Sequence, residues 1–376
     1  MTPPEAASRP GAAPESPHRA AARVDAGGAP VVIGTGILGE LPGLVGGPGT
    51  AVESVAVIHA AGLGEIVRPA CAVLARAGFT VHAEPVPGGE AAKDAGILAG
   101  LWSRLAQHRL TRSDAIVGIG GGAATDLAGF AAATWLRGVR LVLVPTTLLA
   151  MVDAAIGGKT AVNIPEGKNL VGAFHPPAGV LCDLTTLVSL PRADYVSGLA
   201  EIIKAGFIAD PGILDLVESD PGAAGSPDGP HTRELVERAV RMKAAVTSSD
   251  LREAGRREIL NYGHTLGHAI ERVEEYRFRH GDAVAIGMCY AAAVARLAGR
   301  LDEPLAGRHA RVLTAVGLPT SYPAAAWPAL REAMAVDKKS RGKALRMVVL
   351  DGLAQPGILD SPSEDLLTEA YVQVAA

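Results

Sequence analysis

The order of hydrophobic and polar positions divides this chain into two halves. From Val31 to about Leu190, short apolar runs rich in β-branched residues alternate with stretches of helical spacing, as where the run 115–119 is followed by the segment 126–135. Strands that alternate with helices predict a parallel, doubly wound sheet. Beyond Pro191 no strand is expected before residues 346–350, and helices are predicted at 197–209, 232–249, 258–275, 282–301 and 309–316. We therefore expect an α/β domain followed by a mostly α-helical domain.

The first 28 residues show neither helical spacing nor an apolar run typical of a strand. They are rich in Pro, Ala, Gly and Ser, which is typical of a disordered tail. They have no apolar stretch of the kind found in secretory signals, and Glu5, Glu15 and Asp25 argue against an organelle transit peptide. The predicted organisation is a disordered tail at 1–28, an α/β domain at 29–190 and a helical domain at 191–376.

Two features bear on the compartment. The apolar segment 115–136 contains Asp126 and the glycines 120–122, so we expect a buried strand, a loop and a helix there rather than a membrane span. The cysteines, Cys71, Cys182 and Cys289, are far apart and show no CxxC spacing. An odd, scattered set favours a reducing compartment without disulfides. We therefore expect a cytoplasmic protein with no membrane partner.

Composition excludes one class of partner. The chain has 35 basic and 39 acidic residues, a net charge of −4, and only 5 Phe, 3 Trp and 6 Tyr. A nucleic-acid-binding protein needs a basic surface and, for single strands, aromatic rings on which bases stack. We therefore expect no nucleic-acid partner, although the total charge does not exclude one small basic pocket.

A glycine loop follows the predicted strand at 115–119. Gly118, Gly120 and Ala123 fit the pattern GxGxxA, and the loop opens the helix that contains Asp126. Glycines and a helix N-terminus suit a diphosphate, but no acidic residue lies about 20 positions further on to hold a ribose. A tight turn against a closely packed helix remains an equal alternative. The threonines 146–147 end the next strand, where ligands bind in open α/β sheets.

The next segment is rich in polar and cationic groups. It contains Asp153, glycines at 157–158, Lys159, and then Lys168 and Asn169. Two lysines and an amide in a glycine-containing loop suit an anionic substrate. The alternative is an ordinary solvated loop.

The helical half carries candidate metal ligands. Glu201 and Lys204 lie one turn apart, and Asn261, His264 and His268 have the spacing of one helical face. Thr265 stands where HExxH would have its glutamate. Glu201, His264 and His280 would form a zinc set with an open position, as in catalytic sites. Single histidines are more often structural, and the sequence does not show whether these three converge.

The polar segments occur together in one order: GGEAAK at 88–93, GGGAATDLAGFAAATWLRG at 120–138, PTTLLAMVDAAIGGKTAVN at 145–163, GKNLVGAFHPP at 167–177, SGLAEIIKAG at 197–206, REILNYGHTLGHAIE at 257–271, HGDAVAIGM at 280–288 and DKK at 337–339. In this order and spacing the chain resembles the 3-dehydroquinate synthase family, part of the sugar phosphate cyclase superfamily. The resemblance extends from about Val31 to Gly352.

The resemblance implies a Rossmann-like NAD-binding domain, a helical metal- and substrate-binding domain, and an active site between them. It assigns NAD to Glu90, Lys93, Gly122, Asp126, Thr146, Thr147, Lys159, Lys168, Thr186 and Ser189. It assigns Zn²⁺ (or Co²⁺) to Glu201, His264 and His280. Catalytic roles fall on Asp153, Lys159, Lys204, Lys243, Arg257, Asn261 and His268, and further substrate contacts on Arg137, Asn169 and Lys338 (or Lys339).

The family's reaction converts a small anionic sugar-acid phosphate, 3-deoxy-D-arabino-heptulosonate 7-phosphate, to 3-dehydroquinate and phosphate in the shikimate pathway. It proceeds by transient oxidation by NAD, β-elimination of phosphate, reduction and intramolecular aldol closure. The resemblance also implies a homodimer. The alternatives are an amino-dehydroquinate or valiolone synthase, a metal-dependent polyol dehydrogenase, and a regulatory NAD-binding protein without activity. Arg257 and Asn261 favour a carboxylate-bearing substrate and so disfavour the valiolone branch.

Overall fold

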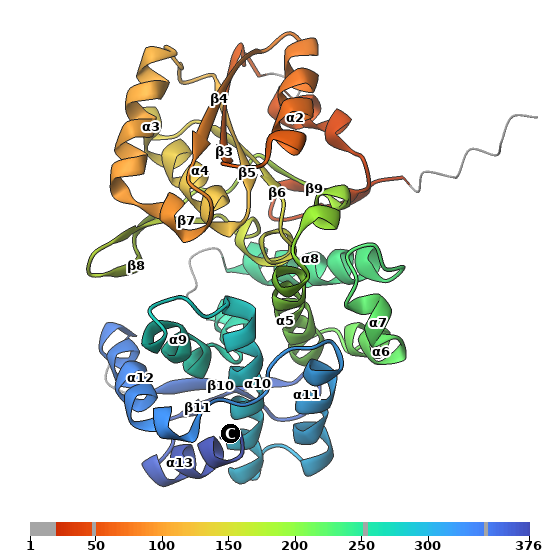
Figure 1. Ribbon diagram of the computed structural model, residues 1–376, viewed down its shortest axis with the longest axis vertical. Helices are drawn as coiled ribbons and strands as arrows, with labels where there is room; N and C mark the ends of the chain where they lie inside the picture. The colour runs from red at the N-terminus through yellow and green to blue at the C-terminus, as the bar shows by residue number, and fades with distance from the viewer. Residues whose placement is uncertain (1–19, 47–49, 251–254, 342–344) are drawn as a thin grey trace, which may run out of the picture.

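The computed structural model describes residues 20–46, 50–250, 255–341 and 345–376, with the backbone alone described at 336–341. Figure 1 shows an α/β body formed by the N-terminal half and a helical body formed by the C-terminal half. The expected fold class, a Rossmann-like α/β domain joined to a mostly α-helical domain, is confirmed. Among the described helices, none combines the length and the apolar character that a membrane span requires.

The α/β domain is built on a seven-stranded sheet in which only β1 is antiparallel to its neighbour. Its strands lie in the order β1 (Ala22–Asp25), β2 (Pro30–Gly34), β9 (Gly179–Asp183), β6 (Arg140–Pro145), β5 (Ala115–Gly120), β3 (Ser54–Ala60) and β4 (Thr80–Val86). One face is covered by α1 (Leu41–Val45) and α2 (Gly64–Arg76), the other by α3 (Ala95–Gln107) and α4 (Gly122–Thr134). Because both faces are covered, the central strand β5 is apolar and buried throughout.

The prediction of a disordered tail at 1–28 is wrong for its last residues. Residues 22–25 form β1, which pairs with β2 from Ala22 opposite Ile33 to Asp25 opposite Pro30. The turn between these strands contains Gly27 and Gly28, both with positive φ, which glycine adopts at little cost. Residues 1–19 lie outside the described part of the chain.

A second difference concerns residues 159–174, which were expected to be a loop. They form an antiparallel hairpin of β7 (Lys159–Ile164) and β8 (Gly167–Phe174). Figure 1 shows it projecting from the α/β body beside α4. Gly129 of α4 allows this contact, since a Cβ there would lie 2.3 Å from the Thr160 side chain. The hairpin therefore carries Lys168 and Asn169 on a defined strand.

The helical domain comprises α5 (Arg192–Ile208), α6 (Gly212–Ser219), α7 (Pro221–Ala224), α8 (Thr232–Ser249), α9 (His264–Val273), α10 (His280–Leu297), α11 (Glu303–Ala315), α12 (Trp327–Arg341) and α13 (Glu364–Val372). A small hairpin of β10 (Arg346–Leu350) and β11 (Pro356–Asp360) packs with them. Both α5 and α10 are buried along most of their length, so they form the centre of this domain.

The single helix predicted at 258–275 is wrong. Residues 256–261 form a 3-10 helix, the chain turns at Gly263 with φ +80°, and α9 begins at His264. A side chain at Gly263 would be strained by this left-handed conformation and would also approach Met288. Asn261 therefore does not share a helical face with His264 and His268.

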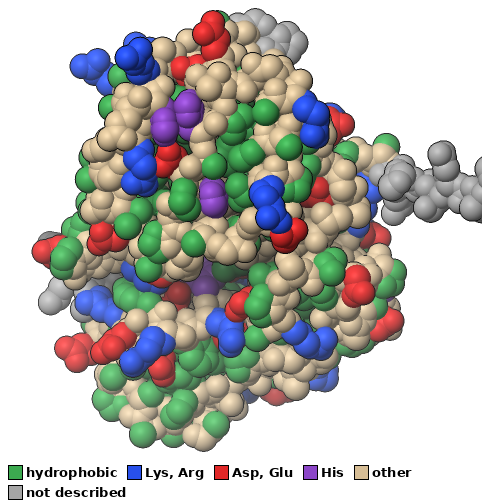
Figure 2. All heavy atoms as spheres, turned by 45° about the horizontal axis from the view of Figure 1, so that its top comes forward, with side chains coloured by type: hydrophobic (Ala, Val, Ile, Leu, Met, Phe, Trp, Pro, Cys, Tyr) green, Lys and Arg blue, Asp and Glu red, His purple; other side chains and the backbone are tan. Residues whose placement is uncertain are grey.

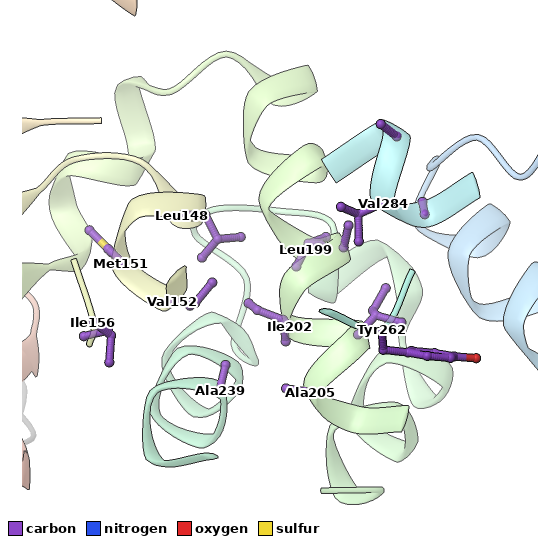
Figure 3. Close-up of a cluster of buried hydrophobic side chains, with 14 of the residues drawn as sticks. Leu148, Met151, Val152, Ile156, Leu199, Ile202, Ala205, Ala239, Tyr262 and Val284 are labelled. Atoms are coloured by element: carbon purple, nitrogen blue, oxygen red, sulfur yellow. The ribbon is translucent and has the colours of Figure 1, made fainter. Parts of the chain in front are cut away.

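The two domains share one hydrophobic core. Figure 3 shows Leu148 and Val152, which follow β6, facing Leu199 and Ile202 of α5, and Met151 belongs to the same core. Met151 and Val152 belong to a single π-helical turn, Ala150–Ala154, which also carries Asp153. Such turns inside helices are frequent at functional sites. The continuous core fixes the position of this turn relative to the helical domain.

Gly287 provides a test of how α9 and α10 are held together. Its Cβ would lie 1.9 Å from the carbonyl oxygen of Gly263. Alanine is normally favoured over glycine inside a helix by about 1 kcal/mol, but here overpacking outweighs propensity. We expect Gly287→Ala to lower the free energy of unfolding by about 1–3 kcal/mol, measured by denaturant and thermal unfolding.

The matched control is Gly64→Ala at the start of α2, where a Cβ would have no atom within 4 Å. This variant is expected to be neutral or slightly stabilising. If Gly287→Ala is also neutral, the close approach of α10 to Gly263 is not as described.

Candidate active site

A cleft of about 1130 Å³ separates the two domains. Its α/β wall consists of the glycine loop at the start of α4, the threonines that follow β6, and the β7–β8 hairpin. Its helical wall comes from α9, α10 and α12. Figure 2 shows the hollow between the two bodies, with histidine side chains visible inside it. A site of this kind, at the carboxyl ends of parallel strands, is where open α/β sheets bind ligands.

Three candidate metal ligands meet at this cleft. Glu201 comes from α5, His264 from the first residue of α9 and His280 from the first residue of α10. The Nε2 atoms of both histidines lie 3.6 Å from Glu201 Oε1, and the three ligand atoms lie within 4.8 Å of one another. The sequence had placed these residues on separate elements, and the fold brings them together.

The hydrogen bonds around this set leave its ligand atoms free to bind a cation. His264 Nδ1 lies 3.1 Å from the Tyr262 carbonyl and His280 Nδ1 lies 3.2 Å from Glu271 Oε2, so each Nδ1–H donates to these acceptors and leaves Nε2 as the ligand atom. Glu201 Oε1 is buried and has no hydrogen-bond partner. An orphaned buried carboxylate oxygen is costly unless a cation binds it, so the residues fit a divalent metal such as zinc.

The protonation states of Glu201 and His264 suit metal binding, and that of His280 sets a competition between a proton and the ion. Burial raises the pKa of Glu201, but Lys204 and the two histidines outweigh it and hold that pKa well below its ordinary value. Burial, followed by the charge of Lys204, holds the pKa of His264 well below its ordinary value. Burial lowers the pKa of His280, but Glu201 and Glu271 outweigh it and raise the pKa to about 10. Glu201 is therefore ionised and His264 neutral, as metal binding requires, whereas His280 carries a proton on Nε2 that a bound ion would replace.

Among its described residues the helical domain buries three cations, of which Lys204 and Lys243 lie beside the metal set. Lys204 donates to Glu201 Oε2 at 2.5 Å and to the Leu260 carbonyl at 2.7 Å. Lys243 donates to the backbone oxygen of Asp153 at 2.7 Å and also to its carboxylate. Burial raises the pKa of Asp153, but Lys243 outweighs it and holds the pKa below its ordinary value. The Asp153–Lys243 pair therefore connects the α/β domain to α8 as an ion pair.

Arg257 is the third of these cations. It is only 3% exposed, and its Nη1 donates to the Gly157 carbonyl at 3.3 Å. Gly157 has φ +97°, and a Cβ there would lie 2.7 Å from the guanidinium. Glycine at this position is thus required both by the backbone and by the close approach of Arg257. Asn261 follows in the same 3-10 helix, next to the carbonyl that accepts from Lys204.

The predicted cofactor residues line the α/β wall. Lys93 is buried and donates to Asp126 Oδ2 at 2.5 Å and to the Asn169 side chain. Burial raises the pKa of Asp126 to about 6, although Lys93 acts in the opposite direction. Lys168 lies 3.4 Å from Glu90. The cleft lining includes Glu90, Lys93, Gly122, Asp126, Thr146, Thr147, Lys168, Asn169, Thr186 and Ser189, together with Asp153, His268 and His280.

Three predicted site residues, Lys159, Arg137 and Asn261, are placed differently, and a fourth, Lys338, is not tested. Lys159 is exposed at the start of β7 and is not part of the cleft lining. Arg137 is exposed at the end of α4 remote from the glycine loop, and it does not line the cleft of its own chain. Asn261 lies on the 3-10 helix at 256–261 and not on the face of α9 that carries His264 and His268. Lys338 belongs to the part of α12 whose side chains are not described.

The structure adds residues that the sequence reasoning missed. Glu271 lines the cleft and contacts His280. Tyr276 places its ring 4.0 Å from Lys168 Nζ, across the cleft between the two domains. Glu271 lies seven residues after His264 and three after His268, so helical spacing could have indicated it. No sequence signal indicates Tyr276, because Glu275 and Tyr276 have positive φ beyond the end of α9.

Comparisons with known proteins agree over most of the chain. A family model described as 3-dehydroquinate synthase N-terminal matches residues 83–197, and one described as 3-dehydroquinate synthase C-terminal matches residues 198–340. The chain is 66% identical over 345 residues to the 3-dehydroquinate synthase of Thermobifida fusca (strain YX), covering 92% of this chain and 93% of that protein. It is 60% identical over 344 residues to that of Streptomyces coelicolor, covering 92% and 94%.

Solved structures give the same fold. A 2-deoxy-scyllo-inosose synthase complexed with carbaglucose-6-phosphate, NAD⁺ and Co²⁺ has a TM-score of 0.83 and 28% identity, covering 93% of this chain and 99% of that one. The 2-epi-5-epi-valiolone synthase of Streptomyces hygroscopicus subsp. jinggangensis, with NAD⁺ and Zn²⁺ bound, has a TM-score of 0.82 and 26% identity, covering 97% and 99%. Because family models match both domains and near full-length relatives are more than half identical, the chain belongs to the 3-dehydroquinate synthase family.

Proposed function

We propose that the chain converts 3-deoxy-D-arabino-heptulosonate 7-phosphate to 3-dehydroquinate and phosphate, as a phosphate-eliminating carbon–oxygen lyase that depends on NAD and a divalent metal. The proposal rests on three buried cations: Lys204 and Lys243 lie beside the Glu/His/His set, and Arg257 lies against the Gly157 carbonyl. Buried cations of this kind suit a small substrate with several negative charges. The relatives named above as 3-dehydroquinate synthases support the choice of substrate.

The chain's own residues have distinct tasks in this reaction. When bound, NAD and the metal supply the transient oxidation of a substrate hydroxyl. Arg257 presents a rigid fork of donors to the substrate carboxylate. The Lys243 ammonium holds a substrate anion, and Asp153 orients that ammonium by accepting its hydrogen bonds. His268 is exposed in the cleft, with its ring 5.0 Å from that of His264, and is placed to exchange a proton with the substrate.

The same cations separate this function from its rivals. A polyol dehydrogenase shares the fold: a probable glycerol dehydrogenase of Sinorhizobium meliloti 1021 has a TM-score of 0.61 at 18% identity. Oxidation of a neutral polyol does not need three buried cations. An amino-dehydroquinate synthase would use the same carboxylate clamp, so its substrate is the appropriate competitor in any assay of this chain.

We also propose a homodimer. The outer strand β8 exposes Leu170, Val171 and Phe174, and the end of α4 exposes Leu136. Within the described residues β8 pairs only with β7, so its second edge has no strand partner. An apolar, unpaired edge strand is a pairing surface, and a second copy of the chain can cover it.

We also propose that the protein is located in the cytoplasm, because its three cysteines are free thiols, as expected in a reducing compartment.

The reaction is tested by following phosphate release. Purified protein with the heptulosonate phosphate, NAD and Zn²⁺ is expected to release one phosphate per substrate consumed, without NADH accumulating, since the cofactor is restored in each cycle. Incubation with the amino-substituted substrate is the parallel assay. Absence of phosphate, or NADH that accumulates in step with turnover, would contradict the proposal.

Metal dependence is tested with His264→Ala. Removing one of three ligands is expected to abolish both bound zinc and turnover while the protein stays folded, because His264 is the first residue of α9 and is not a core side chain. Zinc content is measured by elemental analysis and folding by circular dichroism. Zinc retained at full occupancy in a folded variant would show that the ligand set is wrong.

The dimer is tested with Val171→Asp. A charge on the exposed strand is expected to shift the protein from dimer to monomer at micromolar concentration, measured by light scattering after gel filtration. Val372→Asp is the control, since Val372 is 65% exposed and apolar like Val171 but lies on α13 of the helical domain. A wild-type protein that is monomeric at all concentrations would refute the homodimer.

A further inference from the structure

Glu271 makes a contact that the reaction scheme leaves unexplained. It lies on α9, one turn after His268, and its side chain is only 14% exposed. Its Oε2 accepts from Nδ1 of His280 at 3.2 Å. The opposite nitrogen of the same ring, Nε2, faces Glu201 Oε1 at 3.6 Å. Two carboxylates therefore flank one imidazole, and only Glu201 belongs to the set of ligand atoms that lie within 4.8 Å of one another.

The two candidate histidine ligands are oriented by different groups. His264 Nδ1 faces a neutral acceptor, the backbone carbonyl of Tyr262, at 3.1 Å. His280 Nδ1 faces a carboxylate. A carboxylate fixes the ring orientation and tautomer and also makes the imidazole a more basic ligand, whereas a carbonyl does only the former. The contact with Glu271 therefore distinguishes His280 from His264.

The local balance of charge strengthens this distinction. Glu201 is the single carboxylate of the ligand set, and its Oε2 is already paired with Lys204 at 2.5 Å. Lys243, which is also buried, adds a further positive charge in the same region, paired with Asp153. These two ion pairs are neutral together, so without Glu271 they offer a divalent cation no net negative charge. Glu271 supplies an additional negative charge on the far side of His280.

We propose that Glu271 is a positioning residue for the metal centre: it holds His280 with Nε2 directed at the ion, and its charge strengthens binding of the ion. The inference rests on the proposed metal dependence but not on the identity of the substrate. Glu271 is expected to act through His280 and not to touch the ion itself. Because it also lines the cleft, direct contact with substrate or cofactor is the competing role.

The test compares two replacements. Glu271→Gln keeps a hydrogen-bond acceptor for His280 but removes the charge, and Glu271→Ala removes both. The dissociation constant for Zn²⁺ is measured on the full-length protein by competition with a chromophoric chelator, without substrate or NAD. We expect it to rise about tenfold in Glu271→Gln and towards 100-fold in Glu271→Ala, the range known for such outer contacts. Visible spectra of the Co²⁺-loaded proteins should shift in the same order.

The matched control is Glu275→Gln, the same chemical change one turn further along, on an exposed side chain that pairs with Arg277. It should leave the zinc dissociation constant within twofold of wild type. If both Glu271 variants stay folded and bind zinc as wild type does, the proposal is overturned. It is also overturned if Glu271→Gln raises only the KM for NAD or substrate, which would indicate direct contact. If Glu271→Ala does not fold, Glu271→Gln alone decides.

Because zinc affinity is measured without substrate, this outcome is independent of the phosphate-release assay. Normal zinc binding in wild type with no phosphate release would contradict the proposed reaction and leave the role of Glu271 intact. Loss of phosphate release in Glu271→Gln at saturating zinc would point instead to a role in the chemistry.

Discussion

The buried carboxylate of Glu201 is the constraint on which the rest of the site depends. One of its oxygens is paired with Lys204, and the other is buried without a hydrogen-bond partner. Burying a charged carboxylate costs several kcal/mol unless cations face it, and Lys204 and His280 supply positive charge here. The two histidines that face Glu201 Oε1 begin α9 and α10, which places them at the cleft end of the helical domain. A divalent metal ion, bound in place of the His280 proton, fits this preformed set.

Close backbone contacts hold these helices in place. A Cβ at Gly281 would lie 1.7 Å from the carbonyl of Ser197 on α5, and one at Gly287 would lie 1.9 Å from that of Gly263. These two glycines let α10 approach both neighbouring elements, so that Glu201, His264 and His280 face one point. The Asp153–Lys243 ion pair and the apolar contacts of Leu148 with α5 then fix this point relative to the glycine loop. The cofactor wall and the metal set therefore share one cleft.

The sequence predicts the regular elements well because their signals are local. The helix expected at 232–249 is α8, Thr232–Ser249, and the strand expected at 346–350 is β10. The elements that were predicted wrongly depend on contacts between residues far apart in the sequence. Residues 22–25 become a strand because β2 offers a pairing edge, and the helix predicted at 258–275 is interrupted because Gly263 packs against α10. Helical periodicity alone cannot show either contact.

The site residues divide in the same way, into those that residue type and order predict and those whose placement depends on domain packing. The metal-ligand set was predicted from residue type and order, since carboxylate and imidazole groups on helices have few roles in combination. The placement of Arg137 at the far end of α4, and the contacts of Glu271 and Tyr276, follow from how the domains pack. Tyr276 in particular contacts Lys168 because residues 275–276 adopt positive φ angles, which the local sequence does not predict.

The fold brings Glu201, His264 and His280 together at one metal-binding point. Anomalous diffraction at the zinc edge, from crystals of the zinc-loaded protein, locates the bound ion. We expect one zinc per chain in the interdomain cleft, bound by Glu201 Oε1 and by Nε2 of both histidines, with each Nδ1 still hydrogen-bonded as described. Zinc bound elsewhere, or bound by His268 in place of His280, would contradict this ligand set.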